Sequence, residues 1–228
     1  MVQSRRLIGN YKNLGEIPKG GKSPVEAFAF LKKSRRANFL EKVEVAVVLG
    51  IDTRKSDQVV RGVAKLPHGS GRKSRIAVFA DGEEAQVAIK AGASLVGIES
   101  LEEMIRKGDF QFDVLISPPG NMTRLGKLGP ILGPKGLMPN SKDGTVSADL
   151  SSAVQSVKSG QVKIRTDAGA VVHVQIGHID YSIEKLVENL QVLLEDLRKL
   201  KPSKVNSSSY VKKVSVSSTM GVGIQVSV

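Results

Sequence analysis

The segment Gly20-Gly21-Lys22-Ser23 has the residue types of a phosphate-binding loop, in which backbone amides and a lysine hold the phosphates of a nucleotide. That motif also needs a glycine five residues before its second glycine, and Glu16 stands there. Ser23 is followed by Pro24, with Glu26 three residues after the serine, which is the pattern of a capped helix start. The segment therefore predicts a helix N-terminus and not a site of nucleotide hydrolysis.

Catalytic or metal-binding clusters would have to come from histidines and carboxylates, because the chain has no cysteine. His68, His173 and His178 lack the spacing that brings metal ligands together on one helix. The acidic pairs Glu83-Glu84 and Glu102-Glu103 fall early in predicted helices, where they favour the helix dipole. We therefore predict no catalytic residue, no metal site and no cofactor, and we expect that the protein is not an enzyme.

The glycine-rich stretch in the middle of the chain raises a competing hypothesis, a nucleotide-dependent enzyme. Its glycines do not follow a predicted strand with the spacing G-x-G-x-x-G of a dinucleotide-binding fold. Pro130 and Pro134 lie among them and lack the amide hydrogens that a phosphate cradle uses. A structural loop is the favoured interpretation for the four glycines concerned, Gly126, Gly129, Gly133 and Gly136.

The net charge of the chain is +12, from 34 lysines and arginines against 22 acids, and this favours a polyanionic partner. Residues 1–68 carry 14 basic and 6 acidic side chains and residues 160–228 carry 9 and 6, whereas residues 69–159 carry 11 and 10. The excess positive charge therefore lies at the two ends. Only 4% of the residues are aromatic, so structured RNA fits the composition better than unpaired bases stacked on aromatic rings.

No apolar run approaches the ~20 residues that span a bilayer, and no secretory signal follows Met1. The absence of cysteine argues against a disulfide scaffold and a zinc finger. We therefore expect a soluble intracellular protein without a membrane partner.

Both ends of the chain predict strands with one apolar face and amphipathic helices. The N-terminal end predicts a helix over 24–33 and strands over 43–51 and 60–66. The C-terminal end predicts strands over 161–166 and 170–176, a helix over 183–197, and strands over 210–217 and 222–228. Neither end has enough elements to close a core alone. We therefore expect residues 1–68 and 160–228 to build one split α+β two-layer domain.

The middle of the chain predicts short, almost wholly apolar strands that alternate with helices, which is typical of a parallel sheet covered by helices. The strands are expected over 76–80, 94–98 and 113–117, and the helices over 83–91, 101–107 and 149–158. The fold class is thus α/β with two domains, in which residues 69–159 form an inserted α/β domain. Hinges are expected near 67–71 and near 159.

Three stretches carry a family resemblance. Residues 131–146 read ILGPKGLMPNSKDGTV, residues 49–71 read LGIDTRKSDQVVRGVAKLPHGSG, and residues 218–221 read STMG. They resemble the large-subunit ribosomal protein L-one family, of bacterial type, and the similarity covers roughly residue 23 to the C-terminus. The resemblance implies an RNA-binding split domain with a Rossmann-like insertion. It also implies a protein monomer in the mobile side stalk of a cytoplasmic or organellar ribosome, bound to large-subunit ribosomal RNA and involved in release of exit-site tRNA.

The resemblance also implies RNA contacts. Carried over by matching position, they are Glu26, Phe39, Thr219, Met220 and Gly221. A threonine hydroxyl can bond a 2′-hydroxyl, methionine and phenylalanine can pack on a ribose or base, and glycine permits close approach of the backbone. Without the resemblance, Thr219–Gly221 would be interpreted as a turn between strands. Basic residues are expected on phosphates, namely Lys33, Arg35, Arg36, Arg54, Lys163 and Arg165.

Two alternatives remain compatible with the sequence. Bacterial members of the family also resemble repressors that bind their own mRNA, and the discriminating feature for that role lies in the messenger. A non-ribosomal relative that binds structured RNA during ribosome assembly is a variant of the main hypothesis.

Overall fold

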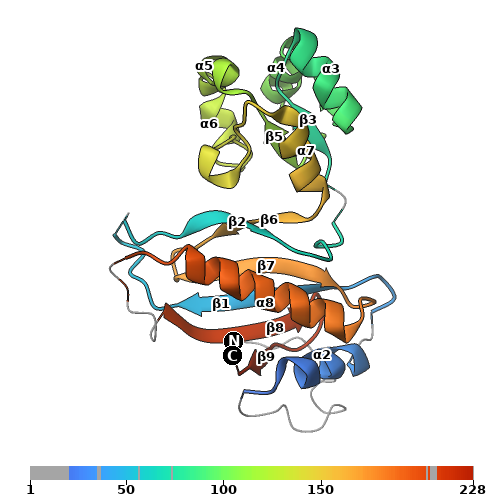
Figure 1. Ribbon diagram of the computed structural model, residues 1–228, viewed down its shortest axis with the longest axis vertical. Helices are drawn as coiled ribbons and strands as arrows, with labels where there is room; N and C mark the ends of the chain where they lie inside the picture. The colour runs from blue at the N-terminus through green and yellow to red at the C-terminus, as the bar shows by residue number, and fades with distance from the viewer. Residues whose placement is uncertain are drawn as a thin grey trace. The chain divides into compact units, whose positions relative to one another are not determined.

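The computed structural model describes residues 21–34, 37–55, 57–72, 74–203, 205 and 210–227. The chain folds as two compact units (Figure 1). Unit 1 contains the residues up to Gly71 together with those from Val162 onward, and unit 2 contains Arg72–Gln161. Helices and strands are mixed in both units, so the predicted α/β class is confirmed.

The centre of unit 1 is a four-stranded antiparallel sheet in the order β7-β1-β8-β9 (Figure 1). Val45 pairs with Val174 on one side and with Val216 on the other, and all three are buried. Because side chains alternate along a strand, this register turns one apolar face of the sheet inward. The strands are β1 (Lys42–Leu49), β7 (Val171–His178), β8 (Val211–Ser218) and β9 (Ile224–Val226).

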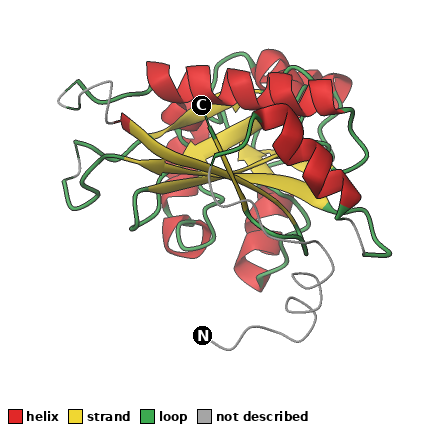
Figure 2. Ribbon diagram, turned by 90° about the horizontal axis from the view of Figure 1, so that it is seen from below, coloured by secondary structure: helices red, strands yellow, loops and turns green. Residues whose placement is uncertain are grey.

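Two helices, α2 (Pro24–Lys33) and α8 (Ile183–Lys199), cover the inner face of this sheet and pack against each other (Figures 1 and 2). The helix predicted over 24–33 is confirmed, and the Ser23 hydroxyl accepts a hydrogen bond from Glu26 N at 3.4 Å. The Ser182 hydroxyl caps α8 in the same way. The apolar stripe of α8 fills the core with Leu186, Leu190, Leu193, Leu194 and Leu197.

A second, two-stranded sheet in unit 1 pairs β2 (Arg61–Lys65) with β6 (Gln161–Arg165). The turn predicted at 167–169 is present, but β6 and β7 on either side of it belong to different sheets. A single bridge, Thr166 to Val172, crosses the turn in the part of the chain described. Ala170 has a φ of 59° there, a left-handed conformation that redirects the chain from one sheet to the other.

Unit 2 contains a three-stranded parallel sheet in the order β4-β3-β5. Ala77 in β3 packs with Leu101 and Ile105, whereas the next residue, Val78, packs with Val154 in a different apolar cluster. Helices therefore cover both faces, as the apolar strands predict. The elements are β3 (Ile76–Val78), α3 (Gly82–Ala91), β4 (Leu95–Val96), α4 (Glu99–Lys107), β5 (Val114–Ile116) and α7 (Leu150–Lys158).

The glycine-rich segment of unit 2 was expected to be a loop, and that prediction was wrong in part. Pro130 lies in the first turn of a short helix, where its missing amide hydrogen is not needed. Leu125, Leu128 and Leu132 are buried and tie the segment to the core of unit 2. Its short elements are η1 (Pro119–Asn121), α5 (Met122–Gly126), α6 (Gly129–Leu132) and η2 (Ser141–Asp143).

Most strands are shorter than predicted, and β4 and β9 differ most from the prediction. β4 has two residues in place of 94–98, and Gly97 with a φ of 138° ends it. β9 has three residues in place of 222–228, and Val228 lies outside the described residues.

Candidate nucleic-acid interface

The turn Thr219–Gly221 holds three of the predicted contact residues, at the end of the sheet where β1 begins. Antiparallel pairing places Val43 opposite Ser218, so the turn lies beside Lys42. Thr219 N donates to Lys42 O at 3.0 Å, and Thr219 Oγ1 accepts from Lys42 N at 2.9 Å. The threonine hydroxyl therefore caps the start of β1. Its second lone pair can accept a hydrogen bond from a bound ligand.

Glu41 joins this turn to the segment that leads from α2 to β1. The residue is 2% exposed. Its Oε1 accepts a hydrogen bond from Ala37 N at 3.4 Å, and its Oε2 accepts one from Met220 N at 3.3 Å. One buried carboxyl group thus holds two segments that lie far apart in the sequence.

Three large apolar side chains are exposed on these two segments. Phe39 is 49% exposed, Leu40 46% and Met220 41%. Apolar side chains gathered on a surface mark a site of interaction more often than scattered ones do. We call Phe39, Leu40 and Met220 the apolar surface; its composition suits packing on the face of a ribose or base.

Gly221 makes its close contact within the protein. Gly221 N donates to Ser218 O at 3.1 Å, and a Cβ on Gly221 would lie 2.2 Å from Ser218 Oγ. The conformation of the turn itself therefore favours glycine at this position. Close approach of RNA to its backbone stays a prediction.

Helix α2 carries two further predicted residues, and both are exposed. Lys33 lies in the last turn, next to the segment that bears the apolar surface. Glu26 lies in the first turn, roughly 10 Å away along the helix axis. Among the described residues, no hydrogen bond or ion pair joins Glu26 to Thr219–Gly221. Arg35 and Arg36 lie outside the described residues.

The other three predicted residues, Arg54, Lys163 and Arg165, are exposed elsewhere in unit 1. Arg54 lies in the turn after β1, and Thr53 Oγ1 in that turn donates to Ala168 O at 2.8 Å. This contact fixes the turn at the far end of β1, an eight-residue strand that spans roughly 23 Å. Lys163 and Arg165 lie two residues apart on β6 and share a face of that strand. The structure therefore separates the predicted residues into two groups.

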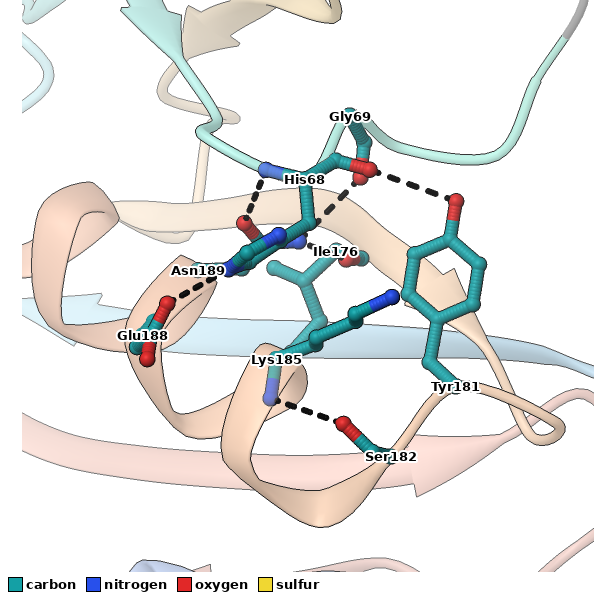
Figure 3. A network of polar contacts seen from close by, with 8 residues as sticks. All are labelled: His68, Gly69, Ile176, Tyr181, Ser182, Lys185, Glu188 and Asn189. Atoms are coloured by element: carbon teal, nitrogen blue, oxygen red, sulfur yellow. Dashed lines mark hydrogen bonds and ion pairs between the residues drawn. The ribbon is translucent and has the colours of Figure 1, made fainter.

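The segment Pro67–Gly71, which was expected to act as a hinge, is held by side chains of unit 1 (Figure 3). Asn189 of α8 is fully buried, and its Oδ1 accepts a hydrogen bond from His68 N at 3.1 Å. Its Nδ2 donates to Gly69 O at 3.1 Å and to Ile176 O at 2.8 Å. Tyr181 OH donates to His68 O at 3.3 Å. This network fixes the backbone of the segment at two successive residues.

Two of the three histidines make hydrogen bonds within unit 1, and the third lies on its surface. His68 Nε2 bonds the Glu188 carboxylate (Figure 3), and His178 Nε2 donates to Gly71 O at 2.6 Å. His173 is exposed on β7. Over the described residues, no group of three histidines or carboxylates has the geometry to hold a metal ion. Likewise, no described helix is long and apolar enough to cross a membrane.

The start of α3 in unit 2 can be compared with the phosphate site of dinucleotide-binding folds. Such a phosphate binds at the N-terminus of the helix after the first strand, where free amide hydrogens point outward. In unit 2 the Asp81 carboxylate accepts the hydrogen bond from Gly82 N at 2.8 Å and caps α3. A carboxylate of the protein itself therefore takes up this amide hydrogen, and its negative charge disfavours a phosphate there.

The sequence interpretation missed Glu41 and Leu40. A signal for Glu41 was available, because Val43, Val45 and Val47 alternate as inward-facing residues and the same period places residue 41 on the inward side. An acid at an inward-facing position is unusual unless it has a polar partner. Leu40 gave no such signal, since a single exposed leucine is ordinary.

The chain is similar to known proteins over most of its length. Residues 31–222 match the Ribosomal protein L1p/L10e family. The Large ribosomal subunit protein uL1 of Vibrio vulnificus (strain YJ016) is 52% identical over 201 residues, which cover 88% of this chain and 86% of the relative. The protein of the same name from Alkalilimnicola ehrlichii is 51% identical over 201 residues, 88% of this chain and 87% of the relative. The chain therefore belongs to the Ribosomal protein L1p/L10e family, a family of structural ribosomal proteins and not of enzymes.

Proposed function

We propose that the protein is a structural constituent of the large ribosomal subunit that binds a folded element of ribosomal RNA through the apolar surface and the turn Thr219–Gly221. The observation that carries this proposal is the joint exposure of Phe39, Leu40 and Met220 around a turn held by Glu41. Relatives named large ribosomal subunit proteins support the ribosomal assignment.

The chemistry of the surface favours folded RNA as its ligand. Phe39 and Met220 offer apolar faces to a ribose or an unstacked base. Thr219 offers a lone pair to a 2′-hydroxyl, which separates RNA from DNA at that contact. Lys33 supplies a cation for a nearby phosphate, and such contacts position the RNA without selecting its sequence.

The proposal is tested by binding to a side-stalk fragment of large-subunit ribosomal RNA and to a scrambled hairpin of equal length, over a series of salt concentrations. The wild-type protein is expected to prefer the fragment, and Phe39→Ala and Met220→Ala are each expected to weaken fragment binding about tenfold. Val87→Ala removes a similarly exposed apolar side chain (44%) from α3 in unit 2 and serves as the matched control. Equal binding of both RNAs by the wild-type protein would contradict the proposal.

Two substitutions are needed to test the role of Thr219 in RNA binding, because its hydroxyl also accepts a hydrogen bond from Lys42 N at the start of β1. Thr219→Ser keeps the hydroxyl, and Thr219→Val keeps the shape and removes it. We expect near wild-type binding for the serine variant and a loss of about fivefold or more for the valine variant. Thermal unfolding of both variants separates the part of this loss that comes from the bond to Lys42.

We further propose that Arg54, Lys163 and Arg165 serve a second RNA partner, the exit-site tRNA. The support is their separation from the apolar surface by the length of β1. Replacing Arg54 and Arg165 by glutamate should weaken tRNA retention on ribosomes that carry the variant. It should leave binding of the side-stalk fragment within about threefold of wild type, apart from a salt-dependent part. A loss that appears only with the ribosomal RNA would contradict this assignment.

Repression of the protein's own messenger would use the same apolar surface, if the leader folds like the ribosomal site. The support is that one surface binds any RNA with the same shape and exposed bases. A reporter that carries the native leader should be repressed by excess wild-type protein and not by Met220→Ala. A reporter indifferent to both proteins removes this role.

A further inference from the structure

The buried carboxyl group of Glu41 lies directly beneath the proposed RNA-binding surface. It is 2% exposed, and no salt bridge to it exists among the described residues. A buried acid without a cation is uncommon, because burial of a polar group costs free energy unless hydrogen bonds replace water. Here those bonds come from two peptide groups, Ala37 N and Met220 N.

The two peptide groups belong to the two segments that carry the apolar surface. Ala37 is buried and precedes Phe39 and Leu40, whereas Met220 N belongs to the residue whose side chain forms the rest of that surface. Glu41 O also accepts a hydrogen bond from Ile179 N at 3.0 Å, which fixes the main chain at Glu41 to the residue after β7. The side chain of Glu41 thus bonds to both segments from a fixed point of the sheet.

We propose that Glu41 is a positioning residue for RNA binding, which holds Phe39 and Met220 as one rigid surface through its bonds to Ala37 N and Met220 N. The proposal rests on the proposed function of that surface. Binding of a folded RNA costs less when the protein surface is already ordered, since little side-chain and loop entropy remains to be lost.

The sign of the charge effect makes the proposal testable. A negative charge near phosphates weakens RNA binding, so its removal alone should strengthen binding slightly. Glu41→Gln removes that charge at nearly constant shape, but its amide NH₂ cannot accept the hydrogen bond that one carboxylate oxygen accepts. Glu44→Gln, on the exposed side of β1, removes the same charge without touching either segment and is the matched control.

The experiment measures binding of the side-stalk fragment and of the scrambled hairpin by the wild-type protein, Glu41→Gln and Glu44→Gln. We expect Glu41→Gln to lose about tenfold in affinity for the fragment, while Glu44→Gln binds it as tightly as wild type or slightly more tightly. The scrambled hairpin should bind to both variants alike, as tightly as to the wild-type protein or slightly more tightly. In the Glu41→Gln background, Met220→Ala should cost clearly less than it does in the wild-type protein, because Met220 is no longer held in place. Fragment binding by Glu41→Gln that equals or exceeds that of Glu44→Gln overturns the proposal.

A measurement without RNA separates this proposal from the proposed function. Amide hydrogen exchange at Ala37 and Met220 should become faster in Glu41→Gln and stay unchanged in Glu44→Gln. Unchanged exchange at both amides overturns the positioning role, whichever RNA the protein binds. A wild-type protein that fails to prefer the fragment overturns the proposed function and leaves the exchange result to decide on Glu41. If Glu41→Gln does not fold, Glu41→Asp, which is too short to reach both amides, takes its place with the same expected outcomes.

Discussion

At the scale of single residues, the buried polar groups of unit 1 divide into those that are satisfied and those that are not. Asn189 and Glu41 have hydrogen-bond partners on other segments. The Tyr210 hydroxyl is buried, in a residue that is 1% exposed, and it has no hydrogen-bond partner among the described residues. Glu41 holds the segments of the apolar surface, and Asn189 holds the segment Pro67–Gly71. The tyrosine hydroxyl contributes no hydrogen bond to stability and is therefore the better target for stabilisation.

Tyr210→Phe is expected to leave stability at pH 7 unchanged or to raise it by about 1 kcal/mol, because it removes a buried hydroxyl that has no partner. Burial raises the pKa of Tyr210 from 10.0 to about 12. Between these two values the unfolded chain loses the phenolic proton and the folded protein keeps it, so wild-type stability falls as the pH rises. At pH 11 the loss from this group is on the order of 1 kcal/mol, and the phenylalanine variant avoids it.

Urea unfolding of both proteins at pH 7 and pH 11 checks this prediction. The stability difference in favour of Tyr210→Phe should be larger at pH 11 than at pH 7. A difference independent of pH would mean that the hydroxyl titrates alike in the folded and unfolded states.

At the scale of elements, helix α8 combines a cap with an apolar stripe, and both were readable in the sequence. Ser182→Ala should destabilise unit 1 by about 1 kcal/mol, because it removes the hydrogen bond from the side chain to Lys185 N at the start of α8. Ser151→Ala in the first turn of α7, outside a cap position, should change stability by less than about 0.5 kcal/mol. Chemical denaturation of the two variants measures the difference, and equal effects would show that the cap is unimportant.

The sequence predicted the elements in which a regular apolar pattern extends over many residues. It failed where contacts between distant segments determine the conformation. The apolar stripe of α8 extends over several helical turns, and the alternation in β1 over several residue pairs. The sequence therefore identified one as a helix and the other as a strand. The segment 126–144 lacks such a period, and its helical turns depend on buried leucines that find partners in unit 2. The separation of Arg54 from Thr219 could not be predicted from their residue types, because strand direction places them at opposite ends.

At the scale of the whole molecule, each unit has a hydrophobic core of its own. In unit 1 a single cluster joins residues from both ends of the chain, such as Val45 and Val216. Unit 2 is one continuous segment with clusters on both faces of its sheet. We therefore propose that the two units are separate domains, and that residues 69–159 are the insertion.

The isolated segment 72–161 is expected to fold without the rest of the chain. Its two clusters need no residue from unit 1, and its N-terminal end is held by Asp113, which bonds Arg75 N at 3.0 Å and Arg72 Nη2 at 2.8 Å. These contacts, with the Arg75 amide first, hold the pKa of Asp113 below its ordinary value. A cooperative thermal transition of the segment, with dispersed amide signals in its NMR spectrum, is the expected result. A segment that shows neither would mean that unit 2 depends on unit 1.

The chain first passes from unit 1 to unit 2 near Gly71, and the contacts on either side of this crossing indicate where a hinge could lie. Residues 68–71 are held to unit 1 by Asn189, Tyr181 and His178, whereas Arg72 and Arg75 are held to unit 2 by Asp113. We therefore propose that the freedom of this crossing is greatest at the bonds that follow Gly71, which would make a shorter hinge than the one the sequence predicts at 67–71. Release of the first set of contacts should move the pivot back toward Pro67 and widen the range of motion.

Asn189→Ala tests this pivot, because it removes three hydrogen bonds to His68, Gly69 and Ile176 at once. We expect a loss of about 2 to 3 kcal/mol in stability and faster exchange of the His68 amide. Small-angle scattering should report a broader distribution of sizes than in the wild-type protein. Gln191→Ala, on the exposed side of α8, is the control and should change none of the three. Faster exchange at His68 without a broader distribution would mean that the hinge lies elsewhere, and the second crossing near Ser159 would then be the one that limits the motion.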